Sequence, residues 1–219
     1  MENEIRGMLR AHGADLVCFA DISGLPAGQT RGFPGAVVIC MALPRGFILA
    51  TRNGEPTGRD EFLEKERAVD GLADRLAEHL QAKGWRAFPQ SEAALMKNGG
   101  FDAATRSSRL PHKTIARLAG MGFVGKNNLL VTREYGCGFC MCTVLTDAPL
   151  AVEKRPPQEP GCGACEVCKT VCPAHAIHGV EWSEEGGRDA VVDVFKCACA
   201  LRCVVNCPRT LEYALGVSP

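Results

Sequence analysis

The stretch Cys162-Gly-Ala-Cys165-Glu-Val-Cys168-Lys-Thr-Val-Cys172-Pro173 decides how the C-terminal part of this chain can fold. Its spacing is typical of bacterial ferredoxins, in which three thiolates bind one [4Fe-4S] cubane and the fourth binds a neighbouring cluster. Two-residue gaps let successive thiolates reach different irons, while the last gap and the proline turn the fourth cysteine away. The alternatives are a zinc site, which leaves cysteines over, and ordinary buried thiols. The run therefore predicts iron-sulfur ligation.

A second, less regular group of cysteines follows, and a regular ferredoxin run would need a cysteine where Ala200 stands. The eight distal cysteines still suffice for two cubanes, which could pass single electrons between them. The first cluster is expected to be held by Cys162, Cys165, Cys168 and Cys207. The second is expected to be held by Cys172, Cys197, Cys199 and Cys203. The competing interpretation is one intact cluster beside a degenerate or [3Fe-4S] site.

The composition narrows the class of protein. The chain has 219 residues, 46% of them hydrophobic and 23% charged, which is typical of a globular protein and excludes disorder. Residues 2–13 are too polar for a secretory signal, and the longest apolar run, residues 36–43, is short of the roughly 20 residues that span a bilayer. We therefore expect a cytoplasmic protein without a membrane partner, where closely spaced cysteines favour metal or redox chemistry. The net charge of zero predicts that nucleic acid is an unlikely partner.

Hydrophobic periodicity predicts alternating helices and strands up to about residue 150. Helices are expected over residues 2–12, from a capping box at Thr57 to Lys83, and over residues 111–119. Strands are expected over residues 16–20, 36–41, 129–132 and 139–146. Charges and three prolines in residues 153–160 indicate a boundary, giving domains 1–152 and 153–219. The expected fold is an α/β (α+β) N-terminal domain with a mixed sheet, plus a small lobe that needs clusters to fold.

The glycines of residues 120–126, Gly-Met-Gly-Phe-Val-Gly-Lys, match two phosphate-binding patterns. Both patterns require a strand before the glycines and a helix after them, so that the phosphate meets a helix N-terminus. Here the predicted helix comes first and the strand second. We therefore do not expect a phosphate-binding loop.

Residues 110–132, Glu134-Tyr-Gly136 and residues 143–150, followed by the double set of cysteines, resemble epoxyqueuosine reductases and, more distantly, reductive dehalogenases. The resemblance covers roughly residues 105–208. It implies a nitroreductase-related α/β domain that carries cobalamin, and a ferredoxin-like lobe whose two [4Fe-4S] clusters feed electrons to the cobalt. By the same resemblance, the corrin would be bound by Gly122, Gly125, Lys126, Asn127 and Thr132.

The resemblance also bears on substrate and proton supply. The tRNA-modifying reductases have a proton-donating Asp three residues before the proline of this helix, and Ser108 stands there instead. We therefore expect a reductase of an unidentified small molecule that takes electrons from a donor such as ferredoxin or flavodoxin. His112, on the same helical segment, is the candidate proton donor. The alternatives are an electron-transfer or corrinoid-handling protein without its own substrate, and an epoxyqueuosine reductase of tRNA.

Three more cysteines, Cys137, Cys140 and Cys142, fall just before and within the predicted strand 139–146. They are interpreted either as small core residues beside a cofactor pocket or as a thiolate ligand, redox pair or third metal site. Cys18 and Cys40 lie singly in apolar strands and are expected to be packing residues.

Overall fold

The structure, a computed structural model, describes residues 1–55, 59–152 and 155–217. Its residues group into two compact units. The first unit comprises Met1–Met41, Phe62–Met121 and Cys140–Pro156. The second comprises Ala42–Glu61, Gly122–Phe139 and Pro157–Pro219. The second unit thus includes two stretches of the N-terminal half besides the C-terminal one. The division into domains 1–152 and 153–219 stays a prediction.

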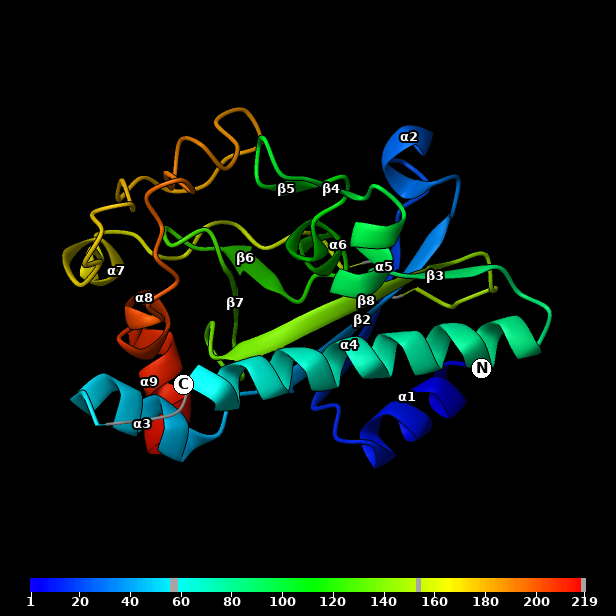
Figure 1. The fold of residues 1–219 in the computed structure, drawn as a ribbon, viewed down its shortest axis with the longest axis horizontal. Helices are drawn as coiled ribbons and strands as arrows, with labels where there is room; N and C mark the ends of the chain where they lie inside the picture. Colours follow the sequence, from blue (N-terminus) through cyan, green and yellow to red (C-terminus); the bar gives the residue numbers. More distant parts are fainter. Residues whose placement is uncertain (56–58, 153–154, 218–219) are drawn as a thin grey trace. The chain divides into compact units, whose positions relative to one another are not determined.

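In the described residues, the first unit is organised around a four-stranded sheet (Figure 1). Its strands, in spatial order, are β1 (Leu16–Asp21), β2 (Gly35–Ala42), β8 (Phe139–Thr146) and β3 (Ala87–Pro89). β1 pairs antiparallel with β2, and β3 pairs antiparallel with β8. The two central strands are buried along nearly their whole length, as expected for strands covered on both faces. The sheet is the hydrophobic core of this unit.

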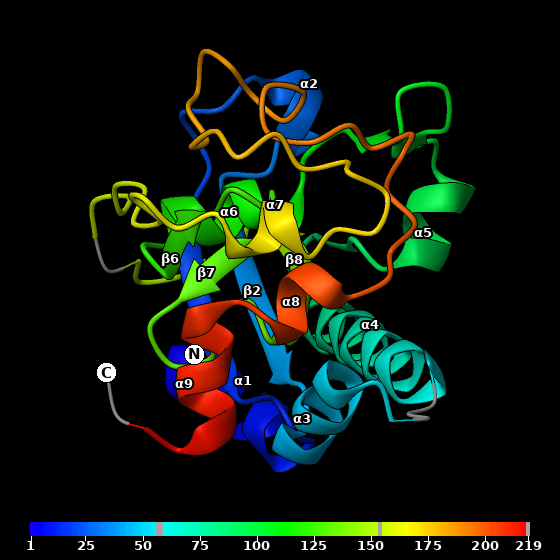
Figure 2. The same cartoon turned by 90° about the vertical axis from the view of Figure 1, so that its left-hand side faces the viewer.

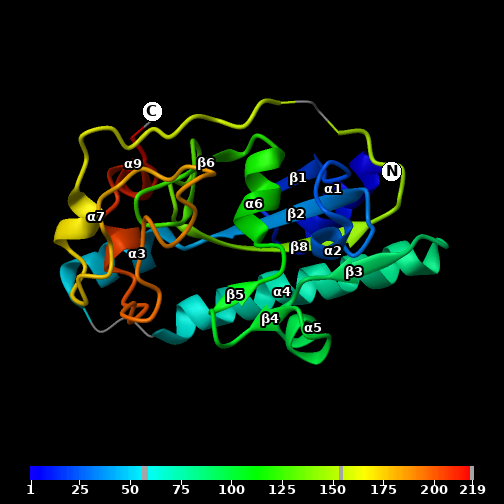
Figure 3. The ribbon, with the colours of Figure 1, turned by 90° about the horizontal axis from the view of Figure 1, so that it is seen from above.

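Helices and a small hairpin complete the first unit. They are α1 (Glu2–Ala11), α2 (Ala27–Thr30), α4 (Arg59–Ala82), α5 (Glu92–Lys97), α6 (His112–Leu118), and the hairpin of β4 (Phe101–Asp102) and β5 (Ser107–Ser108). α4 runs beside β8, as Figures 1 and 3 show, and buries Leu72, Leu76 and Leu80. Glu4 pairs with His79 and Lys83, which ties α1 to α4. α6 contacts β1.

The second unit consists of short elements joined by long loops. They are α3 (Arg45–Asn53), β6 (Gly122–Val124), β7 (Leu130–Thr132), α7 (Val167–Thr170), α8 (Arg202–Val205) and α9 (Pro208–Leu215). β6 and β7 form an antiparallel hairpin. α3 lies against α8 and α9 (Figure 2), where the Arg202 guanidinium donates to the Thr51 carbonyl at 3.0 Å. The Tyr213 hydroxyl donates to the Leu43 carbonyl at 3.0 Å. The C-terminal cysteines thus share a unit with residues 45–53.

In the first unit, the structure has the predicted helices α1, α4 and α6 and strands β1, β2 and β8 to within a few residues, and the mixed α/β class is confirmed. The short elements α2, α5, β3, β4 and β5 of this unit were not predicted. The expected helix cap at Thr57 lies outside the described residues. The glycines at 120–126 form no phosphate-binding loop, because Gly122 begins β6 instead of preceding a helix.

In the part of the chain that the structure describes, no helix has the length and apolar character needed to cross a bilayer.

Candidate metal centre

The four cysteines expected to hold the first cluster lie close together. Cys162 and Cys165 precede α7, Cys168 lies within it, and Cys207 is the N-terminal cap of α9. Cys168 interacts electrostatically with the other three. Burial, and then the charge of Cys162, raises the pKa of Cys168 to about 11. A metal cluster would have to displace protons from these thiols, because only thiolates bind iron.

Part of the second set also gathers. Cys203 lies in α8 and interacts with Cys197, Cys168 and Cys172; burial, then these charges, raises its pKa to about 12. Cys172 and Cys203 pack against a small hydrophobic core, which Cys168 also contacts. Cys197 and Cys199 are exposed. The core consists of Ala176, Ile177 and Val192.

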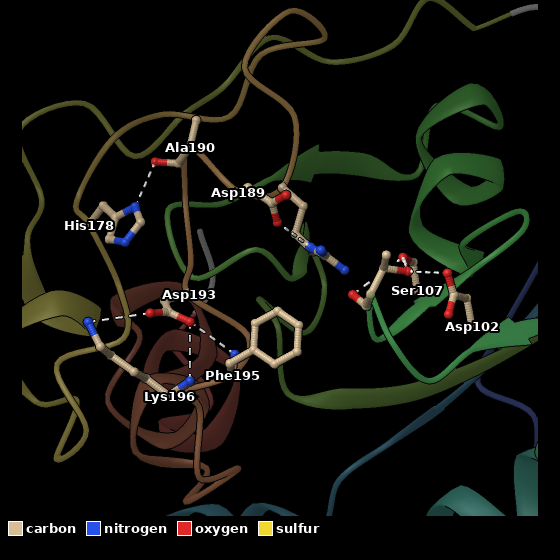
Figure 4. Close-up of polar contacts among 10 residues, drawn as sticks. Asp102, Ser107, His178, Asp189, Ala190, Asp193, Phe195 and Lys196 are labelled. Atoms are coloured by element: carbon tan, nitrogen blue, oxygen red, sulfur yellow. Dashed lines mark hydrogen bonds and ion pairs between the residues drawn. The ribbon is translucent and has the colours of Figure 1, made fainter.

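A turn at Asp193 leads into this second set. The Asp193 carboxylate accepts hydrogen bonds from the backbone N–H groups of Phe195 and Lys196 at 3.0 and 3.2 Å, and its other oxygen pairs with Lys196 Nζ at 3.3 Å (Figure 4). The backbone N–H of Cys197 then donates to the Asp193 carbonyl at 3.2 Å. These hydrogen bonds hold residues 193–197 in a turn and so position the backbone of Cys197.

Among the described residues, no three His, Cys, Asp or Glu side chains already surround a position for a single metal ion. A cubane asks for a wider arrangement, since each of its four thiolates binds a different iron. Two neighbouring groups of thiols within one unit fit that requirement. Ligation by the eight cysteines stays a prediction.

Cys207 has an environment unlike that of the other cysteines. The Cys137 thiol hydrogen-bonds to it, as do the backbone N–H groups of Thr210 and Arg209, and together these donors lower the pKa of Cys207. The same hydrogen bond, with burial, raises the pKa of Cys137. Asn127 Nδ2 lies 3.3 Å from Cys137 Sγ, and Thr210 Oγ1 lies 3.4 Å from it. The sequence alone gives no sign of this contact between Cys137 and Cys207, because 70 positions separate the two residues.

The five residues assigned to a corrin all belong to the second unit and have protein partners. Lys126 is 7% exposed, and its ammonium donates to the Gly163 carbonyl at 2.6 Å. The buried Asn127 donates to Cys137 and accepts from the Leu129 backbone N–H at 3.3 Å. The Thr132 hydroxyl accepts from the Tyr135 backbone N–H at 3.1 Å. The side chains of Lys126, Asn127 and Thr132 thus form hydrogen bonds within the protein.

The two glycines of that set are required by close packing. A Cβ on Gly122 would lie 2.0 Å from the Val131 carbonyl oxygen, and one on Gly125 would lie 2.9 Å from Val131 Cγ2 and 3.6 Å from Cys162 Sγ. The next backbone N–H, that of Lys126, hydrogen-bonds to Cys162. The turn between β6 and β7 therefore packs on a predicted cluster ligand.

His112, the expected proton donor, is partly buried in the first unit. Its Nδ1 lies 2.9 Å from Thr143 Oγ1, and desolvation lowers its pKa to about 4. His112 is therefore neutral at pH 7, because its surroundings disfavour the imidazolium that a proton donor would need. Its catalytic role stays a prediction. Ser108 lies on β5, opposite Phe101, in the hairpin whose turn is fixed by Asp102 and Ser107 (Figure 4).

Cys140 and Cys142 are buried on β8 in the first unit. Burial, then the charge of Glu66, raises the pKa of Cys140 to about 12. Burial, and then the nearby Asp70, raises the pKa of Cys142 well above its usual value. Both are therefore protonated at neutral pH, which fits the interpretation of small core residues.

No protein-family model matches the chain. It is 31% identical over 120 residues to an epoxyqueuosine reductase of Escherichia coli (strain K12), a match that covers 55% of this chain and 27% of that protein. The structure is similar to a catabolic reductive dehalogenase, with a TM-score of 0.73 and 20% identity over 96% of this chain and 32% of the other. It is also similar to an epoxyqueuosine reductase solved with a tRNA stem loop, with a TM-score of 0.58 and 18% identity, over 97% of this chain and 66% of the other.

The tRNA-bound neighbour corrects one expectation. Nucleic acid was expected to be an unlikely partner because the net charge is zero, yet a protein with this fold is solved on a tRNA stem loop. That expectation is wrong, since net charge averages over the whole surface and leaves local basic regions unseen.

The chain matches about a quarter of the length of the curated relative from Escherichia coli, whose name is that of an oxidoreductase. The sequence alignment with this relative covers more than half of the chain, and the structural alignments cover nearly all of it. Over part of its length the chain is similar in sequence to epoxyqueuosine reductases, and its fold is similar to those of epoxyqueuosine reductases and reductive dehalogenases.

Proposed function

We propose that this chain is an iron-sulfur oxidoreductase that reduces a nucleoside of the epoxyqueuosine type in tRNA. The observation that carries the proposal is the gathering of the distal cysteines into two neighbouring groups, in a chain related to epoxyqueuosine reductases. Two [4Fe-4S] clusters would each pass one electron at a time. Two such transfers would supply the electron pair that the reduction consumes. An external donor such as ferredoxin or flavodoxin would supply the electrons.

Support for the first cluster comes from Cys162, Cys165, Cys168 and Cys207. Backbone N–H groups hydrogen-bond to Cys162 and Cys168, and the start of α9 donates to Cys207. Such donors stabilise thiolates and a negatively charged cluster.

Support for the second cluster comes from the backbone conformation of residues 199–201. Cys199 and Leu201 have φ values of 48° and 56°, in the left-handed region where each non-glycine residue costs about 1–3 kcal/mol. Ligation of Cys197, Cys199 and Cys203, with Cys172, would supply free energy to offset that cost.

Cobalamin is implied by the resemblance. The side chains of Lys126, Asn127 and Thr132 are bonded within the protein, so they do not fit as direct donors to a corrin in this arrangement. We derive no step through cobalamin, and its binding stays a prediction. The expected division of labour, with substrate chemistry in residues 1–152 and the electron relay in residues 153–219, is part of the proposal.

A second candidate is a reductase of a small molecule. Ser108 favours it, because a serine hydroxyl stands where the tRNA-modifying relatives are expected to have a proton-donating Asp. The two candidates share the clusters and differ in substrate.

The test is an anaerobic single-turnover assay with protein reconstituted with iron and sulfide. Reduced flavodoxin and a tRNA stem loop carrying epoxyqueuosine are added, with and without cobalamin, and the nucleoside is analysed by mass spectrometry. The reduced nucleoside should form with the parent protein and with Cys18→Ser, but not with Cys165→Ser. An unchanged nucleoside in both cobalamin arms, despite two reducible clusters, would contradict the tRNA substrate and leave the small-molecule candidate.

A further inference from the structure

Cys137 is held rigidly against the start of α9. Its backbone N–H donates to Thr210 Oγ1 at 3.1 Å, and its side chain is 4% exposed. Both flanking residues are glycines in close contact with Thr210: a Cβ on Gly136 would lie 2.3 Å from the Thr210 backbone nitrogen, and one on Gly138 would lie 2.8 Å from Thr210 Cγ2. The chain can pass this closely only without side chains at 136 and 138. The Cys137 thiol therefore has a fixed position next to Cys207.

The hydrogen bonds around Cys137 have a direction. Asn127 Nδ2 can only donate, so the contact of 3.3 Å makes Cys137 Sγ an acceptor from Asn127. The Thr210 hydroxyl, 3.4 Å from Cys137 Sγ, hydrogen-bonds to both sulfurs, and Cys137 has one proton of its own to donate to its sulfur partner Cys207. The order is therefore Asn127 to Cys137 to Cys207. This chain of donors ends on the sulfur predicted to bind the first cluster.

The other predicted ligands of the first cluster have no such neighbour among the contacts found in the described residues. Cys162 and Cys168 each accept from a backbone N–H, that of Lys126 and of Lys169 respectively. Within the part of the chain described, only Cys207 receives a side-chain thiol, in addition to two backbone donors and the Thr210 hydroxyl. Most of the hydrogen-bond donors found around the proposed first cluster therefore act on one ligand, Cys207.

We propose that Cys137 is a positioning residue that raises the reduction potential of the first cluster by donating an S–H hydrogen bond to the Cys207 sulfur. Reduction adds negative charge to a cluster, and a donor at a ligand sulfur stabilises that charge, so it favours the reduced state. This role differs from that of a ligand or a disulfide partner, because Cys137 keeps its proton and no bond to sulfur or iron forms. The inference rests on the proposed iron-sulfur function.

The experiment compares Cys137→Ala, Cys137→Val and Cys137→Ser with the parent in the full reconstituted chain. Iron and sulfide are counted, and the midpoint potential of each cluster is measured by EPR-monitored redox titration. Alanine and valine remove the donor, so we expect one cluster to become about tenfold harder to reduce, about 59 mV lower for a one-electron couple. Serine keeps a donor and should stay near the parental potential. Cys40→Ala removes a fully buried thiol of β2 and should change neither potential.

Each outcome decides the matter. Equal potentials in the parent and in either apolar variant would overturn the tuning role, as would loss of the clusters from both apolar variants while serine retains them. The latter result would make Cys137 a packing residue. Absence of any cluster from the parent protein would instead contradict the proposed function, so the two failures are distinguishable.

Discussion

At the residue scale, Cys207 and His112 owe their environments to contacts with residues distant in the sequence. The spacing from Cys162 to Cys172 is a local property, so the expected grouping could be written down from the sequence alone. The contact between Cys137 and Cys207 joins residues 70 positions apart and depends on where α9 begins. His112 shows the same limit, because its lowered pKa comes from burial that no spacing reveals.

His112 should make stability depend on pH. Its pKa is about 4 in the folded protein against 6.5 for an ordinary histidine, so the unfolded chain takes up the proton first as the pH falls. The stabilising contribution is full above pH 6.5 and is lost between about pH 6.5 and 4. We expect the free energy of unfolding, from urea titrations at pH 7.5 and 5, to fall less in His112→Gln than in the parent. The exposed control His12→Gln should behave like the parent; an equal fall in His112→Gln would contradict the burial of this imidazole.

At the scale of elements, long periodic segments were predictable and short ones were not. The helix ending at Ala82 and the strand Phe139–Thr146 are long enough for the spacing of their apolar residues to indicate a helix and a strand. β6 begins with a glycine and spans Gly122–Val124, so its strand character comes from pairing with β7 rather than from propensity. α3 was missed because its buried residues, Phe47 and Ile48, are too few to set a period.

Gly122→Ala tests the β6–β7 hairpin. The new methyl group would lie 2.0 Å from the Val131 carbonyl oxygen, so the strands must separate. We expect a loss of stability of about 1–3 kcal/mol or more in urea denaturation, as for other overpacked sites, together with weaker iron binding. Gly71→Ala is the matched control: it meets open space in α4 and should stabilise by about 0.5–1 kcal/mol. Parental stability in Gly122→Ala would mean that β6 and β7 do not pair as described.

At the scale of the whole molecule, the α/β class followed from the alternation of helices and strands, whereas the interleaving of the two units did not. Sequence composition places one boundary where prolines and charges gather, at residues 153–160. It cannot show that Ala42–Glu61 and Gly122–Phe139 join the cysteine-rich stretch, because those contacts span up to about 170 positions.

Metal content is the prediction for the whole chain. Two cubanes imply about eight iron and eight sulfide per chain after anaerobic reconstitution. We expect Cys165→Ser to lose iron and to lower the melting temperature, since ligation also supplies folding energy, while Cys18→Ser keeps both near the parental values. About four iron and four sulfide in the parent would support the competing interpretation of a single intact cluster.

The interleaved second unit has a consequence for biosynthesis. α3 is made early, but its partner helix α9 and the ligand Cys207 are made about 150 residues later. At about 5–20 residues per second, the ribosome takes roughly 7–30 s to cover that distance. Until then α3 has no α8 or α9 to pack against, and the proposed first cluster would lack its fourth thiolate. If the first cluster forms as proposed, its assembly on the nascent chain would therefore wait until Cys207 has been synthesised.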